Sequence, residues 1–224
     1  MTIRWAVPAL SAAVPLVALL VRRAARRSGA TEAEAGRTLP GDELLPAADL
    51  QNDRACTIGA PPAAVWPWIA QLGQDRAGFY SFETLENLVG CRITGATRAH
   101  PEWQHIGPGD RFRLHPDVAL RVAQVEPGSH LLVTSQGGDA PGGADLAMTW
   151  LFHLSPVVLP GGATGTRLHL RERYATGGGT ARVMTELVGV VSAVMTWRML
   201  TRLQELVVGD ERPAARVLRL HTSG

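Results

Sequence analysis

Alternating apolar and polar residues predict an antiparallel β-sheet in the middle of the chain. In "LAMTWLFHL", residues 146–154, every second residue is large and apolar. Because successive side chains of a strand point to opposite faces, this pattern gives a sheet one apolar and one solvated face. Strands are also predicted over residues 53–60, 110–115, 119–127, 130–136 and 166–174, with glycine or proline between most of them.

Helical patterns precede and follow these strands. Residues 61–72 predict a helix that begins at two prolines, which the first turn of a helix tolerates. Residues 81–89 predict a second short helix with Ser81 as its N-cap. From about Thr180 to Val208 apolar residues recur every three or four positions, so we expect one long helix whose apolar stripe lies across the sheet. The stripe comprises Met184, Leu187, Val188, Val191, Val194, Met195, Met199 and Leu203.

An apolar segment near the N-terminus predicts a membrane anchor. Residues 5–21 carry no charge, and Arg22 and Arg23 follow at once. A helix of this length spans about 26 Å, slightly less than the roughly 30 Å hydrocarbon core of a bilayer. The flanking arginines can close the difference by extending toward the headgroups. We therefore expect a single transmembrane helix here, since the uncharged run of residues 187–195 is too short for a second one.

The arginines around this segment set its expected orientation. Arg4 precedes the apolar run, whereas positions 22, 23, 26 and 27 after it are all arginine. Because positive charge favours the cytoplasmic side, we expect a single-pass protein of the cell membrane whose folded domain is cytoplasmic. Pro8 and Pro15 weaken a helix, which leaves an interfacial or a cleaved segment as the alternative.

Composition and cysteine spacing exclude several classes of function. All 22 basic residues are arginine and the formal net charge is +2, which is too small to indicate nucleic acid as a partner. Cys56 and Cys91 have no metal-binding spacing and are expected to be reduced, apolar side chains. The expected organisation is an anchor with an arginine-rich flank (1–27), a linker able to lie along the domain surface (28–52), a folded domain (53–208) and a tail (209–224).

The order of these elements resembles a known fold. A strand, two short helices, a run of antiparallel strands and a long terminal helix resemble the helix-grip fold of the START-related lipid-transfer and polyketide cyclase superfamily (SRPBCC). "APPAAVWPWIAQLG", "RAGFYSFETLEN", "HPEWQHIGPGD" and the strand that contains Trp150 are similar to an uncharacterised bacterial subgroup. The resemblance covers residues 42–208. It implies an α+β fold in which a curved sheet wraps around the C-terminal helix, with a cavity between them for a hydrophobic small molecule or lipid.

The large side chains of the apolar face either line that cavity or fill it. A cavity of about 300 Å³ costs roughly 7 kcal/mol, which is a large share of a total stability of about 5–15 kcal/mol. Trp66 and Trp68 are two residues apart on one helix, so only one of them can point inward. The candidates for the lining are Trp66, Tyr80, Phe112, Trp150, Phe152, Glu172, Tyr174, Leu187 and Val191.

Glu172 is the candidate polar group of the cavity. Alternation along its strand places the carboxylate on the apolar face, where it needs a partner such as Arg76 or Arg121 or a raised pKa. Our leading hypothesis is binding of a hydrophobic molecule without covalent chemistry. In a cyclase or dehydratase, Glu172, Tyr80 or His105 would serve as acid or base. In a third reading the aromatic residues fill the cavity and the domain binds a protein partner at the membrane.

Neither a metal nor a cofactor is expected. His100, Glu102 and His105 are ligand types for divalent metals, but Pro101 and Trp103 argue against a helix that presents them together. We expect these residues in a loop at the mouth of the cavity. The glycine-rich stretches match no phosphate-loop or dinucleotide pattern and are expected to be turns.

Overall fold

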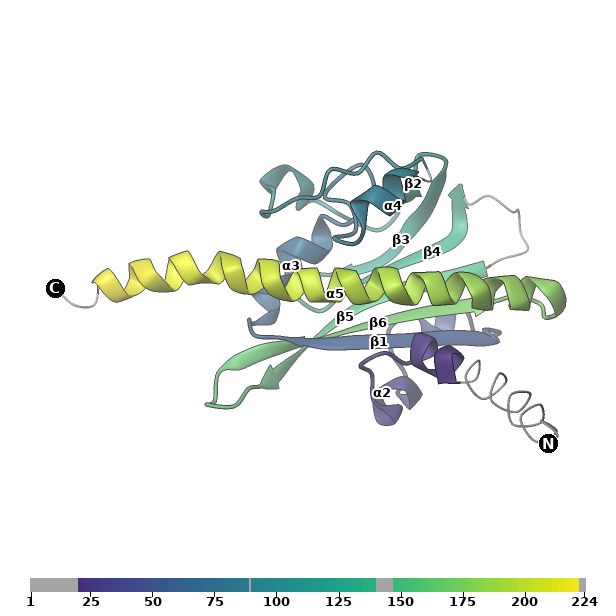
Figure 1. Cartoon of the computed structure of the whole chain (residues 1–224), viewed down its shortest axis with the longest axis horizontal. Helices are drawn as coiled ribbons and strands as arrows, with labels where there is room; N and C mark the ends of the chain where they lie inside the picture. The colour runs from purple at the N-terminus through teal and green to yellow at the C-terminus, as the bar shows by residue number, and fades with distance from the viewer. Residues whose placement is uncertain (1–19, 89, 140–146, 222–224) are drawn as a thin grey trace, which may run out of the picture.

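The protein consists of one antiparallel sheet and one long helix that crosses it (Figure 1). The computed structural model describes residues 20–88, 90–139 and 147–221. The strands are β1 (Leu50–Ile58), β2 (Arg111–His115), β3 (Val118–Glu126), β4 (His130–Asp139), β5 (Ala147–Val158) and β6 (Thr164–Ala175). The helices are α2 (Glu32–Gly36), α3 (Pro62–Ala70), α4 (Glu83–Leu88) and α5 (Gly179–His221), with 3₁₀ turns at Asp42–Leu44 and Pro101–Trp103. Residues 20–26 are also helical.

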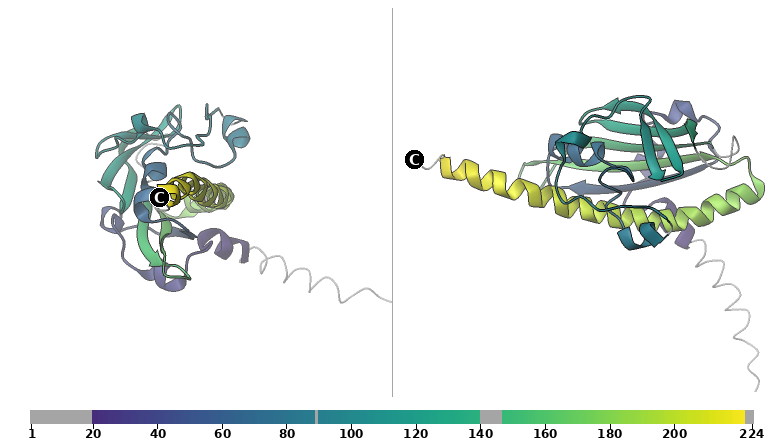
Figure 2. Two further views of the ribbon diagram at one scale, coloured as in Figure 1. Left: turned by 90° about the vertical axis from the view of Figure 1, so that its left-hand side faces the viewer. Right: turned by 90° about the horizontal axis from the view of Figure 1, so that it is seen from above.

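Hydrogen bonds join the six strands in the order β1-β6-β5-β4-β3-β2, and each neighbouring pair is antiparallel. The sheet curls, and α5 crosses its concave side (Figures 1 and 2). Phe152 on β5 lies opposite Leu131 on β4 and Leu170 on β6, and all three side chains are buried in the core. The expected α+β class, with a curved antiparallel sheet packed against a long C-terminal helix, is confirmed.

Helix α5 is longer than predicted. It continues to His221, so much of the stretch that we expected to be a tail after residue 208 is helical. Within the described part of the chain, its segment Gly179–Gly209 is the one helix long and apolar enough to cross a membrane. That segment nevertheless covers the sheet and contributes Met199 and Leu203 to the core. Because a sheet with open edges is not stable in lipid, its packing favours a core helix over a span. The predicted N-terminal span, residues 5–21, lies almost entirely outside the described residues.

The predicted apolar stripe of α5 is wrong for the first half of the helix. There the buried residues are small or polar, as at Thr185, Gly189 and Thr196. Five members of the stripe are instead 51–64% exposed, namely Met184, Leu187, Val188, Val191 and Val194. The cause is a charge on the sheet beneath. The guanidinium of Arg54 on β1 donates hydrogen bonds to the Gly189 carbonyl and to the Ser192 and Thr196 hydroxyls, so the polar side of α5 faces the sheet.

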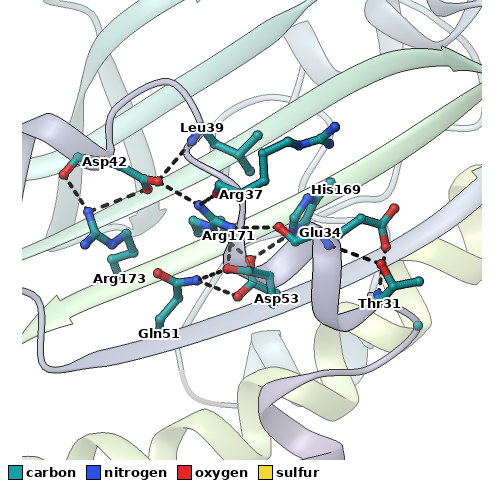
Figure 3. Close-up of polar contacts among 12 residues, drawn as sticks. Thr31, Glu34, Arg37, Leu39, Asp42, Gln51, Asp53, His169, Arg171 and Arg173 are labelled. Atoms are coloured by element: carbon teal, nitrogen blue, oxygen red, sulfur yellow. Dashed lines mark hydrogen bonds and ion pairs between the residues drawn. The ribbon is translucent and has the colours of Figure 1, made fainter.

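The second face of the sheet is not solvated as expected, because residues 28–45 cover it (Figure 3). Arg171 on β6 is central to this contact and is 2% exposed. Its side chain donates five hydrogen bonds, to Asp53, to Asp42 and to the carbonyls of three residues between positions 34 and 37. His169 lies 2.9 Å from the same Asp53 carboxylate. The linker therefore packs on the domain through buried charge.

Replacing Arg171 tests whether this contact stabilises the fold. Arg171→Met leaves the buried Asp53 carboxylate with less compensation, and loss of one partner of a buried ion pair costs about 3–5 kcal/mol. We expect a loss of that size in the free energy of unfolding, measured with urea. Arg92→Met, at an exposed position, is the control and should change it by less than about 0.5 kcal/mol. Equal stability of the two variants would contradict the account.

His153 also contributes to the stability of the fold, and its contribution depends on pH. It lies between His130 and His169 on adjacent strands. Burial lowers its pKa from 6.5 to about 4, and the nearby charge of Arg37 adds to the shift. Between these pH values the unfolded chain binds a proton that the folded chain does not bind. The stabilising contribution is therefore complete above about pH 6.5 and is lost as the pH falls toward 4.

We expect wild-type protein to lose about 1 kcal/mol of stability from this residue between about pH 7 and 5, allowing for its partial exposure. His153→Leu should remove that part of the pH dependence. Glu34, whose pKa is lowered to about 2 mainly by its hydrogen bond from Arg167, contributes only below its ordinary value of 4.5 and does not overlap. Urea unfolding of both proteins at the two pH values measures the difference. Identical pH slopes would refute the assignment to His153.

Candidate ligand-binding cavity

A cavity of about 190 Å³ lies between α4, α5 and the sheet and is partly open to solvent. Its wall is mostly apolar, with polar groups contributed by α5 and by the α4 region. The lining residues are Phe79, Ser81 and Glu86 from the α4 region, Leu114 on β2, Trp150 on β5, and Ser192, Met195, Thr196 and Met199 on α5. A mostly apolar wall with a few polar groups is typical of sites for small molecules.

Two aromatic side chains, Phe79 and Trp150, line the cavity, and two more pack behind them. The ring of Phe79 stacks on Trp150 at 6.2 Å, and Trp150 contacts Phe152 at 4.6 Å between ring centroids. Phe112 lies edge-on to Phe79 and Trp150. Phe112 and Phe152 are 2% and 0% exposed, so they pack behind the wall. Of the predicted aromatic lining, Trp150 borders the cavity, whereas Phe112 and Phe152 support it.

Glu86 is the most unusual polar residue of the wall. It is 7% exposed, and one carboxylate oxygen accepts a hydrogen bond of 2.5 Å from the Ser81 hydroxyl. The other oxygen is buried and has no hydrogen-bond partner among the described residues. Burial raises the pKa of Glu86, the Ser81 hydrogen bond opposes that shift, and the nearby charge of Glu83 adds to it. The pKa of Glu86 is therefore raised above its ordinary value, so its neutral acid, which can both donate and accept a hydrogen bond, persists to higher pH than that of an exposed glutamate.

Trp150 presents a second unsatisfied group. Its indole nitrogen is buried and, within the described chain, also lacks a hydrogen-bond partner. A buried polar group without a partner costs about 1–3 kcal/mol. Two residues that line the cavity, Glu86 on α4 and Trp150 on β5, thus each carry a polar atom that is buried and has no hydrogen-bond partner among the described residues.

Glu172 is buried, as expected, but its partners differ from the prediction. Its carboxylate lies 2.8 Å from the Arg54 guanidinium and accepts further hydrogen bonds from Asn52, Tyr174 and Ser192. The proposed partners Arg76 and Arg121 instead donate to backbone carbonyls elsewhere. Arg54 on β1 and Glu172 on β6 are more than a hundred residues apart in the sequence and meet because these two strands pair. A local sequence pattern does not reveal this pairing. Four partners saturate Glu172, and Ser192 lies between it and the cavity.

The other predicted residues lie around the cavity rather than in it. Tyr80 is 4% exposed, and its hydroxyl accepts from Gln71 and donates to the Trp68 carbonyl. Tyr174 is buried beside Glu172, and burial raises its pKa. Trp66 is half-buried at the edge of the core.

Leu187 and Val191 are on the outer side of α5, 59% and 64% exposed, and therefore do not reach the cavity. The reason is the orientation of α5 over Arg54 described above, which turns the apolar side of the helix away from the sheet. Glu86, in contrast, was not predicted. The spacing of Phe82, Glu86 and Leu88 is that of any short helix, so the sequence does not show that Glu86 is buried. Its burial depends on the tertiary packing of α4.

The loop with His100, Glu102 and His105 lies away from this cavity. His100 contacts Glu102 at 3.0 Å and stacks on Trp103, while His105 is exposed. His100 and Trp103 border a separate, more polar hollow of about 500 Å³ that also involves Arg76, Arg92 and Arg98. In the part of the chain that the structure describes, no group of three His, Cys, Asp or Glu side chains could hold a metal ion.

Comparisons with known proteins extend no further than similar structures. No family model and no curated protein matches the chain. A protein from Mesorhizobium loti has 19% identity and a TM-score of 0.40, over 70% of this chain and 96% of its own. One from Nitrosomonas europaea has 15% identity and a TM-score of 0.43, over 72% and 96%. One from Arthrobacter aurescens has 13% identity and a TM-score of 0.42, over 71% and 87%. Likeness at this level says nothing about activity or ligand.

The two buried glutamates should respond differently to loss of charge. Glu172→Gln leaves the Arg54 guanidinium buried without its counter-charge and should lower the free energy of unfolding by about 3–5 kcal/mol. Glu86→Gln leaves no buried cation without a counter-charge, because the hydrogen-bond partner of Glu86 is the Ser81 hydroxyl, so stability near neutral pH should stay within about 1 kcal/mol of wild type. Urea unfolding of both variants decides the matter. A larger loss for Glu86→Gln than for Glu172→Gln would reverse the roles we assign.

Proposed function

We propose that the domain binds a small apolar molecule that carries one hydroxyl or carbonyl group, without covalent chemistry. The supporting observation is the cavity itself, whose mostly apolar wall includes the polar residues Ser81, Glu86, Ser192 and Thr196. An alkyl group would contact the methionines and aromatic rings. Its polar end would hydrogen-bond to one of these polar side chains.

The size of the cavity limits the ligand. A volume of about 190 Å³ holds about six water-sized groups at roughly 30 Å³ each. It therefore accepts a compact molecule or one end of a longer chain such as a lipid. Burial of six methylene groups at about 0.8 kcal/mol each contributes roughly 5 kcal/mol, enough for affinity between about 1 mM and 0.1 mM before polar contacts are counted.

The resemblance to the START-related superfamily supports this function. Members of that superfamily share a cavity between a curved sheet and the terminal helix, and this chain has its cavity in the same place. Membership of the superfamily is part of the proposal.

The N-terminal sequence supports a location at the membrane. In the proposal residues 5–21 form a single transmembrane helix and the folded domain is cytoplasmic, held close to the bilayer. The helical residues 20–26 would connect the two, since Arg22 and Arg26 form ion pairs with Glu186 on α5.

A second candidate function is a cyclase or dehydratase, and one observation favours it. A carboxyl group with a raised pKa in an apolar cavity suits general acid–base catalysis. Glu86 takes this role in place of Glu172, Tyr80 and His105, which do not border the cavity. Retained binding with lost turnover in Glu86→Gln would distinguish the enzyme from a carrier.

Filling the cavity tests the binding function. Met195 borders the cavity, whereas Met184 on the same helix is 62% exposed. Met195→Trp should occupy the space and weaken binding of a medium-chain alkanol at least about tenfold, equivalent to about 1.4 kcal/mol. Met184→Trp is the matched control and should bind as wild type does. Isothermal titration calorimetry measures both. Absence of alkanol binding to wild type, or equal binding by the two variants, would refute the proposal.

A further inference from the structure

An exposed apolar surface lies on the side of the molecule away from the sheet. It is formed by α4 and the first half of α5, and we refer to it as the outer surface. Its members are Leu85, Leu88, Val183, Met184, Leu187, Val188, Val191, Val194 and Trp197, each 51–81% exposed. On α5 they recur every three or four residues and so form one continuous side of the helix. Monomeric soluble proteins rarely expose apolar patches of this extent.

The helical segment of residues 20–26 lies on the same side of the molecule. Figure 2 shows this segment and α4 flanking α5, all three away from the sheet. The segment begins with Leu20 and Val21, which are 57% and 47% exposed, and continues into arginines. The four arginines of this region border a hollow of about 300 Å³. Apolar side chains and a basic cluster thus share one side of the protein.

We propose that the outer surface docks onto an anionic lipid bilayer, with α5 lying in the interface parallel to the membrane. Amphipathic helices with an apolar side and nearby arginines bind in this way, and Trp197 suits the interfacial zone. Arg22 and Arg26 share Glu186 and Arg27 pairs with Glu32, so the region keeps a net positive charge, which matches the negative surface potential of anionic lipids. An isologous pair of two copies would repeat the same basic cluster on both partners and would gain no such complementarity.

The chain outside the described residues also favours the bilayer. Residues 5–19 are apolar apart from backbone and serine groups, and they join the described structure at Leu20, on the side of the outer surface. A tether at this point holds the outer surface close to the membrane. Docking is then an intramolecular event, so weak contacts are sufficient.

Docking would connect the cavity to the membrane. The role of this connection rests on the ligand-binding function proposed above. Helix α4 contributes Glu86 to the cavity wall and exposes its neighbours Leu85 and Leu88 on the outer surface. The cavity lies between α4 and α5, the two helices that form this surface. An apolar ligand could therefore pass between bilayer and cavity without crossing water.

Site-specific probes on the full chain test the docking. An environment-sensitive nitrobenzoxadiazole label is placed at Val191→Cys on the outer surface, or at Thr38→Cys, an exposed control position in the segment that covers the opposite face of the sheet. Both are made with Cys56 and Cys91 replaced by alanine. The proteins are reconstituted into phosphatidylcholine vesicles with or without phosphatidylserine.

With phosphatidylserine present, the label at position 191 should shift its emission to shorter wavelength and be quenched several-fold by lipids with a doxyl group on the acyl chain. The label at position 38 should show neither effect. Equal behaviour at the two positions would overturn the proposal, as would equal quenching without phosphatidylserine. A shift at position 191 without lipid quenching would also overturn it. In that case, dependence on protein density would indicate a second copy, and independence would indicate contact with residues 1–19.

A paired variant separates this proposal from the ligand-binding function. Leu187→Ser with Val191→Ser changes only exposed side chains, so the fold and alkanol binding in detergent should stay as in wild type. Quenching of a label at Leu88→Cys should fall to the level of the Thr38→Cys control. Unchanged quenching would overturn the docking, whereas failure of alkanol binding in every protein would refute the cavity function alone.

Discussion

The buried ion pair between Arg54 and Glu172 determines which side of α5 faces the sheet. Both side chains lie on the concave side and are 1% and 4% exposed. A buried charge needs hydrogen-bonding partners, and α5 supplies them from Gly189, Ser192 and Thr196. The helix consequently turns its apolar side outward over this region. Beyond Thr196 the helix buries Met199 and Leu203 in the core instead.

The cavity lies where these two kinds of packing meet. Ser192 and Thr196 border it from the polar part of the contact, and Met195 and Met199 border it from the apolar part. Close packing is difficult at the point along α5 where the residues that face the sheet change from polar ones, which hydrogen-bond to Arg54 and Glu172, to apolar ones in the core. One ion pair thus accounts for the position of the cavity and, through the orientation of α5, for the exposed apolar surface that we propose as a membrane contact.

Much of the fold could be predicted because each strand is amphipathic over its own length. Period-two alternation located β2, β5 and β6, and the change to helical spacing after the glycines at 177–179 located α5. The orientation of α5 could not be predicted, because a helical stripe does not show what it meets. Arg54 and Glu172 are more than a hundred residues apart, and their pairing depends on strand register. Glu86 escaped prediction for a similar reason, since its burial depends on packing between α4, the sheet and α5.

The most direct test removes the ion pair and follows the orientation of α5. In Arg54→Leu with Glu172→Leu, the concave side loses its charge and no longer needs the polar side of the helix. Reactivity of a single cysteine at Val194 or at Ser192, which lie about 200° apart around the helix axis, toward a water-soluble maleimide reports which side faces outward. We predict that position 194 becomes protected and position 192 becomes reactive relative to the protein that keeps Arg54 and Glu172. An unchanged order of reactivity would contradict the account.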